Sequence, residues 1–245
     1  MNIGYFDIHN HILPGIDDGA QNMEETIKML AMEYEDGVRH IIFTPHYVPS
    51  SQEEKNIERS ERIHKAFLNV VKVCKEQFSD IEFFLGNELY YRNDIIKELE
   101  EKRANTMAGS RYILTEFSVN ISYEELKKAM QNYLFHGYLP ILAHMERYQC
   151  LYGRFERMGE LKNMGCFLQM NTENFLEGFF SANKRFCTKA VKEGYIDFLG
   201  TDSHDSVKRK PTMGQAVKYL NKKVDERLIR KILYENPLEI LREKY

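Results

Sequence analysis

The 245-residue sequence predicts an α/β chain folded as a parallel barrel, because short apolar runs alternate with longer segments of helical periodicity. The runs are continuously apolar rather than alternating, which is typical of strands buried on both faces by helices. No linker, repeat or low-complexity tract interrupts this order, so we expect a single domain over residues 1–245. The predicted fold is a distorted barrel of seven βα units.

Seven apolar runs have the length and composition of strands. They cover residues 3–8, 40–44, 81–86, 112–117, 139–143, 166–170 and 196–200. Each is followed by a mostly helical segment, of which the longest is 52–78. This order of strand and helix is the one that a parallel barrel requires.

Capping signals mark the ends of two of the intervening helices. Asn22 lies three residues before Glu25, and Ser122 lies three residues before Glu125, which is the spacing of a capping box. Apolar residues then recur at helical intervals after the first of these signals, and Gly37 follows where the helix can end. These features predict helices in the segments that begin at residues 22 and 122.

The composition indicates a globular protein and argues against several functional classes. Thirty-four basic and 37 acidic residues give a formal net charge of −3, so nothing in the charge balance favours binding to nucleic acid. No window approaches the roughly 18 consecutive apolar residues that span a bilayer. The N-terminal segment lacks the basic and apolar stretches of a signal peptide. We therefore expect a cytoplasmic protein that does not insert into membranes.

The four cysteines do not form a recognisable reactive or metal-binding motif. They lie at positions 74, 150, 166 and 187, and none belongs to a C-x-x-C pair. None is followed six positions later by Arg, so the C-x5-R loop of thiol-based phosphatases is absent. The glycine-rich nucleotide-binding loops and the G-x-S-x-G motif are also absent. Free structural thiols are the expected role.

Histidine and carboxylate side chains gather where the predicted strands end. In a parallel barrel the carboxyl ends of the strands and the loops after them form the functional face. Five of the eight histidines fall there, together with four acidic residues. The candidate residues are His9, His11, Asp18, His46, Glu88, Glu116, His144, Asp202 and His204.

This set has the chemistry of a metal centre. Residues two apart on a strand point to the same side, so His9 converges with His11 and Asp202 with His204. Imidazole and carboxylate are suitable ligands for first-row divalent metals. A single histidine at a strand end is more often structural, but nine such residues are hard to explain by packing alone. The remaining histidines, at positions 40, 64 and 136, do not end strands, and we interpret them as structural or surface residues.

Together these residues resemble the PHP (polymerase and histidinol phosphatase) superfamily, and within it the capsule-operon, manganese-dependent protein tyrosine phosphatases of bacteria, the CpsB-like or YwqE-like group. The motifs are D-I-H-N-H-I-L-P-G-I-D-D-G, T-P-H, G-x-E, H-x-E-R-Y and T-D-S-H, in order along essentially the whole chain. The first and fourth of these are specific to the group. The resemblance implies a distorted barrel of the PHP type that holds three metal ions, with Mn²⁺ expected and Fe, Zn or Mg as alternatives.

The resemblance also implies a division of roles. One metal would bind His9, His11, Glu88 and Asp202, a second Glu88, Glu116 and His144, and a third Asp18, His46 and His204. Arg147 would bind the phosphate, and Arg209 would assist it. Asp202 or His204 could supply a proton where metal does not occupy it. Four carboxylates and three divalent ions leave a surplus positive charge, which suits a phosphate dianion.

Two residues depart from the pattern of the group, and two alternative functions stay open. Tyr47 stands where relatives often have a second His, and Met145 replaces a common Pro. The expected substrate is phosphotyrosine in a protein. By family analogy, that protein is an autophosphorylating tyrosine kinase of capsular or exopolysaccharide synthesis with a Tyr-rich tail. A small-molecule phosphatase of the histidinol-phosphate type and a non-catalytic metal-bearing scaffold are the alternatives.

Overall fold

The computed structural model describes residues 4–178 and 180–243 of the chain. The strands that it describes lie parallel to their neighbours in the sheet. Their bounds are β1 Tyr5–Asp7, β2 Val38–Phe43, β3 His46–Tyr47, β4 Glu82–Leu85, β5 Glu88–Tyr90, β6 Tyr112–Glu116, β7 Leu139–Leu142, β8 Phe167–Asn171 and β9 Phe198–Gly200.

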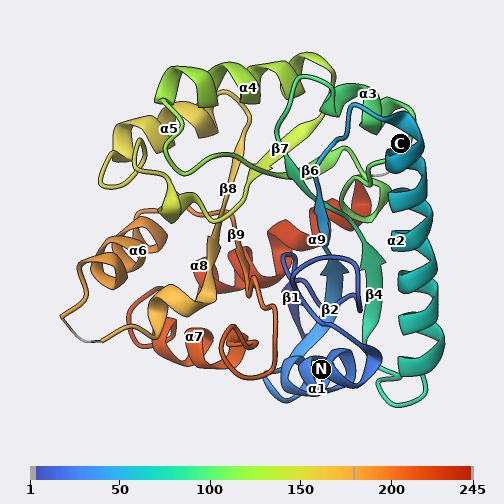
Figure 1. The fold of residues 1–245 in the computed structure, drawn as a ribbon. Coiled ribbons are helices and arrows are strands. Elements are labelled where there is room, and N and C mark those ends of the chain that lie inside the picture. The colour runs from blue at the N-terminus through green and yellow to red at the C-terminus, as the bar shows by residue number, and fades with distance from the viewer. Residues whose placement is uncertain (1–3, 179, 244–245) are drawn as a thin grey trace.

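The strands curl into a distorted barrel (Figure 1). β1 pairs with β2 and β2 with β4, whereas β3 pairs with β5 and is followed around the sheet by β6, β7, β8 and β9. Beyond the strand ends, the Asp202 N–H donates to the His9 carbonyl at 2.7 Å, and the His11 N–H donates to the Ser203 carbonyl at 2.9 Å. These bonds join the two ends of the sheet, so the predicted seven-unit barrel is confirmed.

All seven predicted strands are present, although Ile3, in the first of them, lies outside the described residues. The sequence does not predict β3 and β5 as separate strands. Each resumes the path of the preceding strand after a two-residue break, at 44–45 and 86–87. Pro45 has no N–H to continue the ladder, and its carbonyl accepts a hydrogen bond from the Glu88 N–H at 3.2 Å, where pairing restarts.

Helices follow the strands and cover the outside of the barrel (Figure 1). The predicted segment 52–78 contains the long helix α2. The described helices are α1 Met23–Glu35, α2 Glu53–Cys74, α3 Ile95–Glu100, α4 Tyr123–Phe135, α5 Phe155–Asn163, α6 Ala182–Lys192, α7 Met213–Leu220, α8 Glu226–Arg230 and α9 Asn236–Arg242, with a π-helical turn η4 at Lys231–Glu235 and 3₁₀ turns η1 Met107–Gly109, η2 Met145–Arg147 and η3 Thr172–Phe175.

The predicted caps begin the helices where the sequence places them. The Asn22 side chain accepts a hydrogen bond from the Glu25 N–H at 3.0 Å at the start of α1. Ser122 and Glu125 form a complete capping box at the start of α4. Gly37 follows α1 with a φ of 90°, a left-handed conformation that favours glycine.

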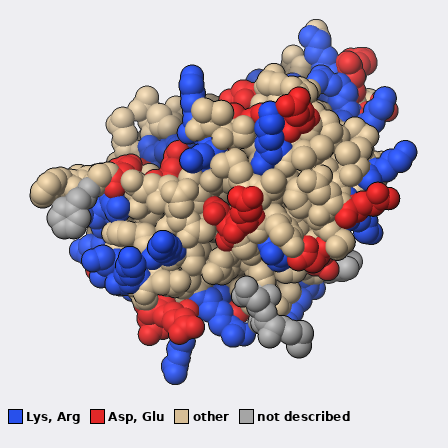
Figure 2. All heavy atoms as spheres, turned by 90° about the horizontal axis from the view of Figure 1, so that it is seen from below, with Lys and Arg blue, Asp and Glu red and all other residues tan. Residues whose placement is uncertain are grey.

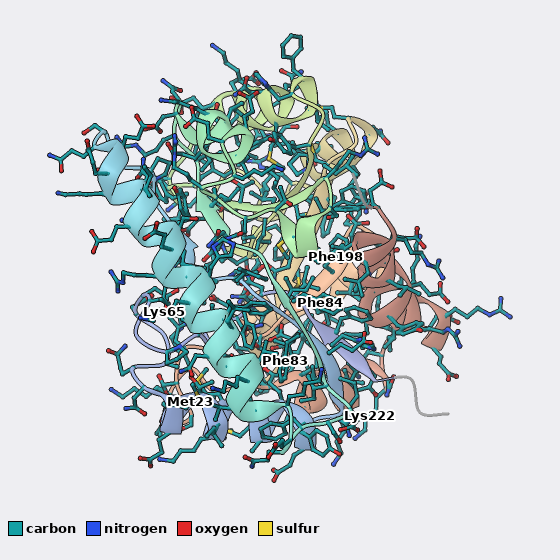
Figure 3. All side chains as sticks on the ribbon, turned by 90° about the vertical axis from the view of Figure 1, so that its right-hand side faces the viewer. Met23, Lys65, Phe83, Phe84, Phe198 and Lys222 are labelled. Atoms are coloured by element: carbon teal, nitrogen blue, oxygen red, sulfur yellow. The ribbon has the colours of Figure 1, made fainter. Side chains whose placement is uncertain are left out.

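Alternate strand residues enter two apolar clusters, one inside the barrel and one beneath the helices. Phe84 and Phe198 belong to the inner cluster, whereas Phe83 stacks on Phe43 in the outer layer at 5.7 Å between ring centroids (Figure 3). The inner cluster also includes Ile240 of α9. Apolar side chains therefore fill the barrel on the side of α9, and polar side chains are left at the carboxyl ends of the strands.

The described surface agrees with the balanced charge of the sequence. On the face shown in Figure 2, acidic and basic side chains are interspersed among uncharged areas. In residues 4–178 and 180–243, no helix combines the length and apolar character needed to cross a membrane.

Candidate metal centre

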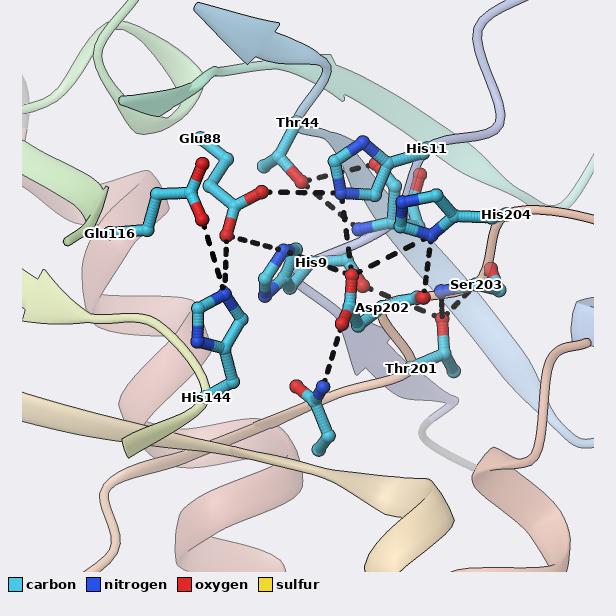
Figure 4. A network of polar contacts seen from close by, with 12 residues as sticks. His9, His11, Thr44, Glu88, Glu116, His144, Thr201, Asp202, Ser203 and His204 are labelled. Carbon is cyan, nitrogen blue, oxygen red and sulfur yellow. Dashed lines mark hydrogen bonds and ion pairs between the residues drawn. The ribbon is translucent and has the colours of Figure 1, made fainter. Parts of the chain in front are cut away.

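The nine residues predicted at the strand ends lie together at the carboxyl ends of the barrel strands. Figure 4 shows most of them converging on one small volume. Four groups of these side chains, which together include all nine residues, have ligand atoms within 4.8 Å of one another: His9, His11 and Asp202; His9, Glu88 and His144; His46, Glu88 and Glu116; and His11, Asp18, His46 and His204.

The first group is buried in the centre of the site. His9 Nε2 lies 3.3 Å from Glu88 Oε1 and 3.5 Å from Asp202 Oδ1. His11 Nε2 lies 3.3 Å from Glu88 Oε2 and 3.4 Å from the same Asp202 oxygen. Both imidazoles are fully buried. Two carboxylates and two imidazoles therefore surround one point, which is the arrangement of a coordination sphere.

A second group extends from Glu88 toward β6. His144 Nε2 lies 2.8 Å from Glu88 Oε1 and 3.7 Å from Glu116 Oε2. His46 Nδ1 lies 2.9 Å from Glu88 Oε2 and 3.2 Å from Glu116 Oε1. Glu88 thus contacts histidines of both groups, as expected of a bridging carboxylate.

The third group lies nearest the solvent. Asp18 Oδ1 is 3.5 Å from both His46 Nε2 and His204 Nε2. The His11 and His204 rings are 4.0 Å apart between centroids, which links this group to the first. The Asp18 side chain is 65% exposed, so this end of the centre is open to a substrate.

Buried atoms without hydrogen-bond partners indicate that the set fits metal ions. Within the described part of the chain, these atoms include His9 Nε2, His11 Nε2, His46 Nδ1 and Glu88 Oε2. They face other ligand atoms of the centre at ion-pair distances rather than forming hydrogen bonds. A buried polar atom without a partner is costly, and a divalent cation would satisfy several of these atoms at once.

The buried carboxylates of the centre are ionised. Burial alone would raise the pKa of Glu88, but His9 and the other histidines around it lower that pKa well below its ordinary value. Burial likewise opposes ionisation of Asp202, and His9 and His11 nevertheless bring its pKa well below the usual range. Both side chains are therefore in the charged form that metal binding requires.

The histidines differ in their affinity for protons. Burial would lower the pKa of His46 and of His144, but Glu116 and Glu88 raise these values to about 10 and about 9. Burial and the charge of His11 instead lower the pKa of His204 to about 4. The lowered pKa of His204 favours the neutral imidazole that a metal ligand requires.

Three further residues orient the predicted ligands. Asp17 Oδ2 lies 2.8 Å from His11 Nδ1 and accepts a hydrogen bond from the His46 backbone N–H at 2.9 Å. Gln169 Oε1 lies 3.0 Å from His9 Nδ1. Asn171 donates to Asp202 Oδ2 at 2.8 Å. Such contacts fix the orientation of imidazole and carboxylate ligands.

Sequence reasoning did not identify Asp17 or Gln169 as members of the site. The available signal for Gln169 was a polar residue two positions before Asn171 on the otherwise apolar strand β8, which places both on one face. Nothing in the sequence separates the role of Asp17 from that of Asp18.

The backbone is strained at two candidate ligands. His144 has a φ of 34° and Asp202 a φ of 51°, in the left-handed region that non-glycine residues rarely adopt. Such conformations cost about 1–3 kcal/mol each and cluster at functional sites. The surrounding contacts hold both side chains in the centre despite this cost.

Two arginines approach the centre from its open side. Arg147 donates to Asp202 Oδ2 at 2.7 Å and to Glu173 Oε1 at 3.4 Å. Arg209 donates to the same Asp202 oxygen at 3.0 Å. Both predicted phosphate-binding residues therefore meet at one buried carboxylate of the centre, and their partly exposed guanidinium groups can bind an anion there.

The other histidines lie away from the centre, as predicted. His40 Nδ1 lies 3.1 Å from Glu82 Oε2, His64 Nδ1 lies 2.8 Å from the Ser60 carbonyl, and His136 lies 3.3 Å from a Glu100 oxygen.

The two departures from the family pattern are both buried. Tyr47 donates to Glu98 Oε2 at 2.7 Å, and Glu98 in turn accepts two hydrogen bonds from Arg103. Met145 is a fully buried residue of the apolar core. Each has a packing role next to a candidate ligand, and neither removes one.

Comparison with models of known protein families assigns the chain to one family. Residues 5–242 match the family model described as "Capsular polysaccharide synthesis, CpsB/CapC". The chain belongs to the CpsB/CapC family. The resemblance drawn from the motifs is therefore confirmed.

Curated relatives of this CpsB/CapC chain are named as phosphatases. The tyrosine-protein phosphatase CpsB of Streptococcus pneumoniae is 33% identical over 243 residues, which cover 97% of this chain and 98% of that protein. The tyrosine-protein phosphatase YwqE of Bacillus subtilis is 26% identical over 226 residues, covering 91% and 86%.

Solved structures share the CpsB/CapC barrel. A structure described as "Crystal structures of YwqE from Bacillus subtilis and CpsB from Streptococcus pneumoniae, unique metal-dependent tyrosine phosphatases" matches with a TM-score of 0.85 and 24% identity, covering 98% of this chain and 95% of that chain. The phosphotriesterase homology protein from Escherichia coli, solved with phosphate in its active site, matches with a TM-score of 0.62 and 13% identity, covering 98% and 99%. These likenesses establish the shared architecture.

Proposed function

We propose that this chain is a metal-dependent protein-tyrosine phosphatase and that residues 1–245 act as one catalytic domain. The observation that carries the proposal is the convergence of nine ligand-type side chains, several with unpartnered buried atoms, beside two arginines. Membership of a family whose curated members are named tyrosine-protein phosphatases supports the same activity.

Three metal ions would be held by these ligands. The first would be held by His9, His11, Glu88 and Asp202, the second by Glu88, Glu116 and His144, and the third by Asp18, His46 and His204. The closeness of Glu88 to histidines of two groups supports its role as a bridge. Mn²⁺ is the ion that we favour, and Fe, Zn and Mg are accommodated by the same imidazole and carboxylate set.

The side chains account for phosphate binding without a cysteine nucleophile. Divalent ions, when bound, act as Lewis acids and lower the pKa of water toward neutrality. Arg147 and Arg209 orient the phosphoryl group and neutralise its charge, because both guanidinium groups already reach the same edge of the centre. A tyrosine phenolate, with a pKa of about 10, leaves without a strong general acid. Asp202 or His204 would supply a proton where a metal does not occupy it.

The substrate is a phosphotyrosine protein. The partner is an autophosphorylating tyrosine kinase of capsular or exopolysaccharide synthesis that has a Tyr-rich tail. Such a kinase fits a family whose description is capsular polysaccharide synthesis. The chain acts in the cytoplasm, where such a kinase tail would lie. Neither nucleic acid nor membrane insertion has a role in this function.

Replacement of Glu88 tests the proposal. Glu88→Gln keeps the shape of the side chain and removes its charge, so bound metal and phosphate release from a phosphotyrosine peptide should both fall, the latter by about 100-fold or more. His64→Gln, on the exposed face of α2, is the matched control and should change neither. Full metal content and full activity in Glu88→Gln would contradict the proposed centre.

A further inference from the structure

A cavity lies along helix α4, next to the segments that follow β5 and β6. It has a volume of about 910 Å³. We call it the α4 groove and define it by Tyr91, Asn120, Ile121, Lys128, Asn132 and Phe135, which line it. None of these residues belongs to the metal centre.

The groove is continuous with the carboxyl ends of β5 and β6. Tyr91 follows β5, and its N–H donates to the carbonyl of Glu116 at 3.0 Å. Ser118, which also lines the groove, is two residues beyond Glu116, so the two Cα atoms are at most about 7 Å apart. The groove therefore begins next to the strand end that carries Glu116.

The dimensions of the groove suit an extended peptide. The lining residues of α4 run from Glu125 to Phe135, which corresponds to about 15 Å along the helix axis. Four or five residues of extended chain span the same distance. The volume is that of a binding site rather than of a packing defect.

The lining offers both polar and aromatic contacts. Asn120 and Asn132 present amide groups that can hydrogen-bond a peptide backbone. The Tyr91 ring is held in place by Phe117, with centroids 5.2 Å apart, and its hydroxyl accepts a hydrogen bond from Asn132 at 3.4 Å. Phe135 is 86% exposed, so its ring is available to a partner.

The lining of the groove contains one acidic and one basic side chain, Glu125 and Lys128. Glu125 is engaged in the capping box with Ser122. Lys128 has an exposed side chain and forms no ion pair with any residue that the structure describes. Glu125 keeps its negative charge, because the hydrogen bonds from Ser122 lower its pKa. Lys128 is the basic side chain in the lining, and it can pair with an acidic side chain of a partner.

We infer that the α4 groove binds the polypeptide that flanks the phosphotyrosine, with an acidic side chain near Lys128 and an apolar side chain against Phe135. This inference rests on the proposed phosphatase function and adds a specificity surface to it. The groove selects protein substrates over small aryl phosphates, because a small molecule held at the metals is too short to reach it.

The test compares two substrates in two groove variants. Lys128→Glu and Phe135→Ala change exposed side chains, and the thermal melting temperature verifies that each variant folds. For a phosphotyrosine peptide with five residues on each side, including acidic ones, KM should rise about five- to tenfold in each variant. For p-nitrophenyl phosphate, kcat/KM should stay within about twofold of wild type. Leu68→Ala, at an exposed apolar position on α2, is the control and should affect neither substrate.

The outcomes separate the two proposals. If both variants hydrolyse both substrates as the wild type does, with an unchanged KM for the peptide, the groove does not bind the peptide and the phosphatase function stands. An equal loss of kcat/KM for both substrates would show that the variants disturb the metal centre, and it would also overturn the peptide-binding role of the groove. If analytical sedimentation shows a dimer for the wild type and a monomer for Phe135→Ala, the surface binds a second copy of the chain and the peptide-binding role is overturned. Failure of the metal-loaded wild type on both substrates would refute the phosphatase function and, with it, the inference.

Discussion

Asp202 connects the two halves of the candidate site. Its Oδ1 lies 3.5 Å from His9 Nε2 and 3.4 Å from His11 Nε2, whereas its Oδ2 accepts hydrogen bonds from Arg147 and Arg209. One carboxylate therefore faces the proposed metals on one side and the proposed phosphate-binding residues on the other. The left-handed backbone at this residue is a strained conformation of the kind that clusters at functional sites.

Arg147 allows phosphate binding to be separated from metal binding. Arg147→Ala should keep the full metal content, because the guanidinium is not a ligand. It should lower kcat/KM for a phosphotyrosine peptide by about 30- to 1000-fold, since it removes about 2–4 kcal/mol of charge-assisted stabilisation of the transition state. Arg147→Lys should recover only part of the activity, because an ammonium group cannot reproduce the planar fork.

Steady-state kinetics and metal analysis on the same preparations measure both quantities. Arg230→Ala is the matched control, since it removes an exposed guanidinium that contacts Glu235 far from the centre. Wild-type kcat/KM in metal-replete Arg147→Ala would mean that Arg147 only forms a surface ion pair with Glu173 and Asp202.

At the scale of the helices and strands, close packing between strand ends positions the candidate ligands. Gly200 ends β9, and a Cβ built on it would lie 2.5 Å from His9 Cβ and 3.0 Å from Gln169 Nε2. Only glycine therefore allows β9 to approach the segment after β1 closely enough for His9 to reach the centre.

Gly200→Ala should accordingly displace His9. We expect a lower metal content and a free energy of unfolding reduced by about 1–3 kcal/mol, as for other overpacked cores. Gly159→Ala in α5 is the control, because its added Cβ would come no nearer than 3.7 Å to Tyr195 and a helical alanine gains about 0.5–1 kcal/mol over glycine. Urea unfolding and metal analysis measure the two effects, and a Gly200→Ala protein that matches wild type in both would refute the packing argument.

The strands and caps could be predicted because local signals determine them. Continuous apolar runs correspond to all seven predicted strands, and the capping box at Ser122 is present as predicted. The short strands β3 and β5 could not be predicted, because they depend on pairing across the sheet after a break rather than on their own composition. Glu88 illustrates this, since its N–H donates to the carbonyl of Pro45, which lies in the break between β2 and β3.

The membership of the candidate site was more predictable than its internal contacts. All nine candidate ligands meet, because the carboxyl ends of parallel strands meet at one end of a barrel. The contacts of Asp17 and Gln169 depend on loop conformation and on neighbouring strands, which sequence spacing does not specify. The convergence of Arg147 and Arg209 on Asp202 likewise depends on tertiary structure.

At the scale of the whole molecule, the barrel keeps its cysteines away from the chemistry. Burial raises the pKa of all four thiols, that of Cys166 to about 12, so little reactive thiolate exists at neutral pH. The inner apolar cluster fills the barrel below the centre, and metal ions bound there would stabilise the folded chain further. The cysteine thiols are thus poor candidates for a nucleophile, in agreement with a metal-dependent activity.

The most direct test is phosphate release from a phosphotyrosine peptide by protein stripped of metal and then titrated with Mn²⁺, with and without prior treatment with iodoacetamide. We predict that the stripped protein is inactive, that Mn²⁺ restores activity more fully than Mg²⁺, and that alkylation changes neither result. Full activity in protein shown to be free of metal, or inactivation by iodoacetamide while the metals stay bound, would contradict the account.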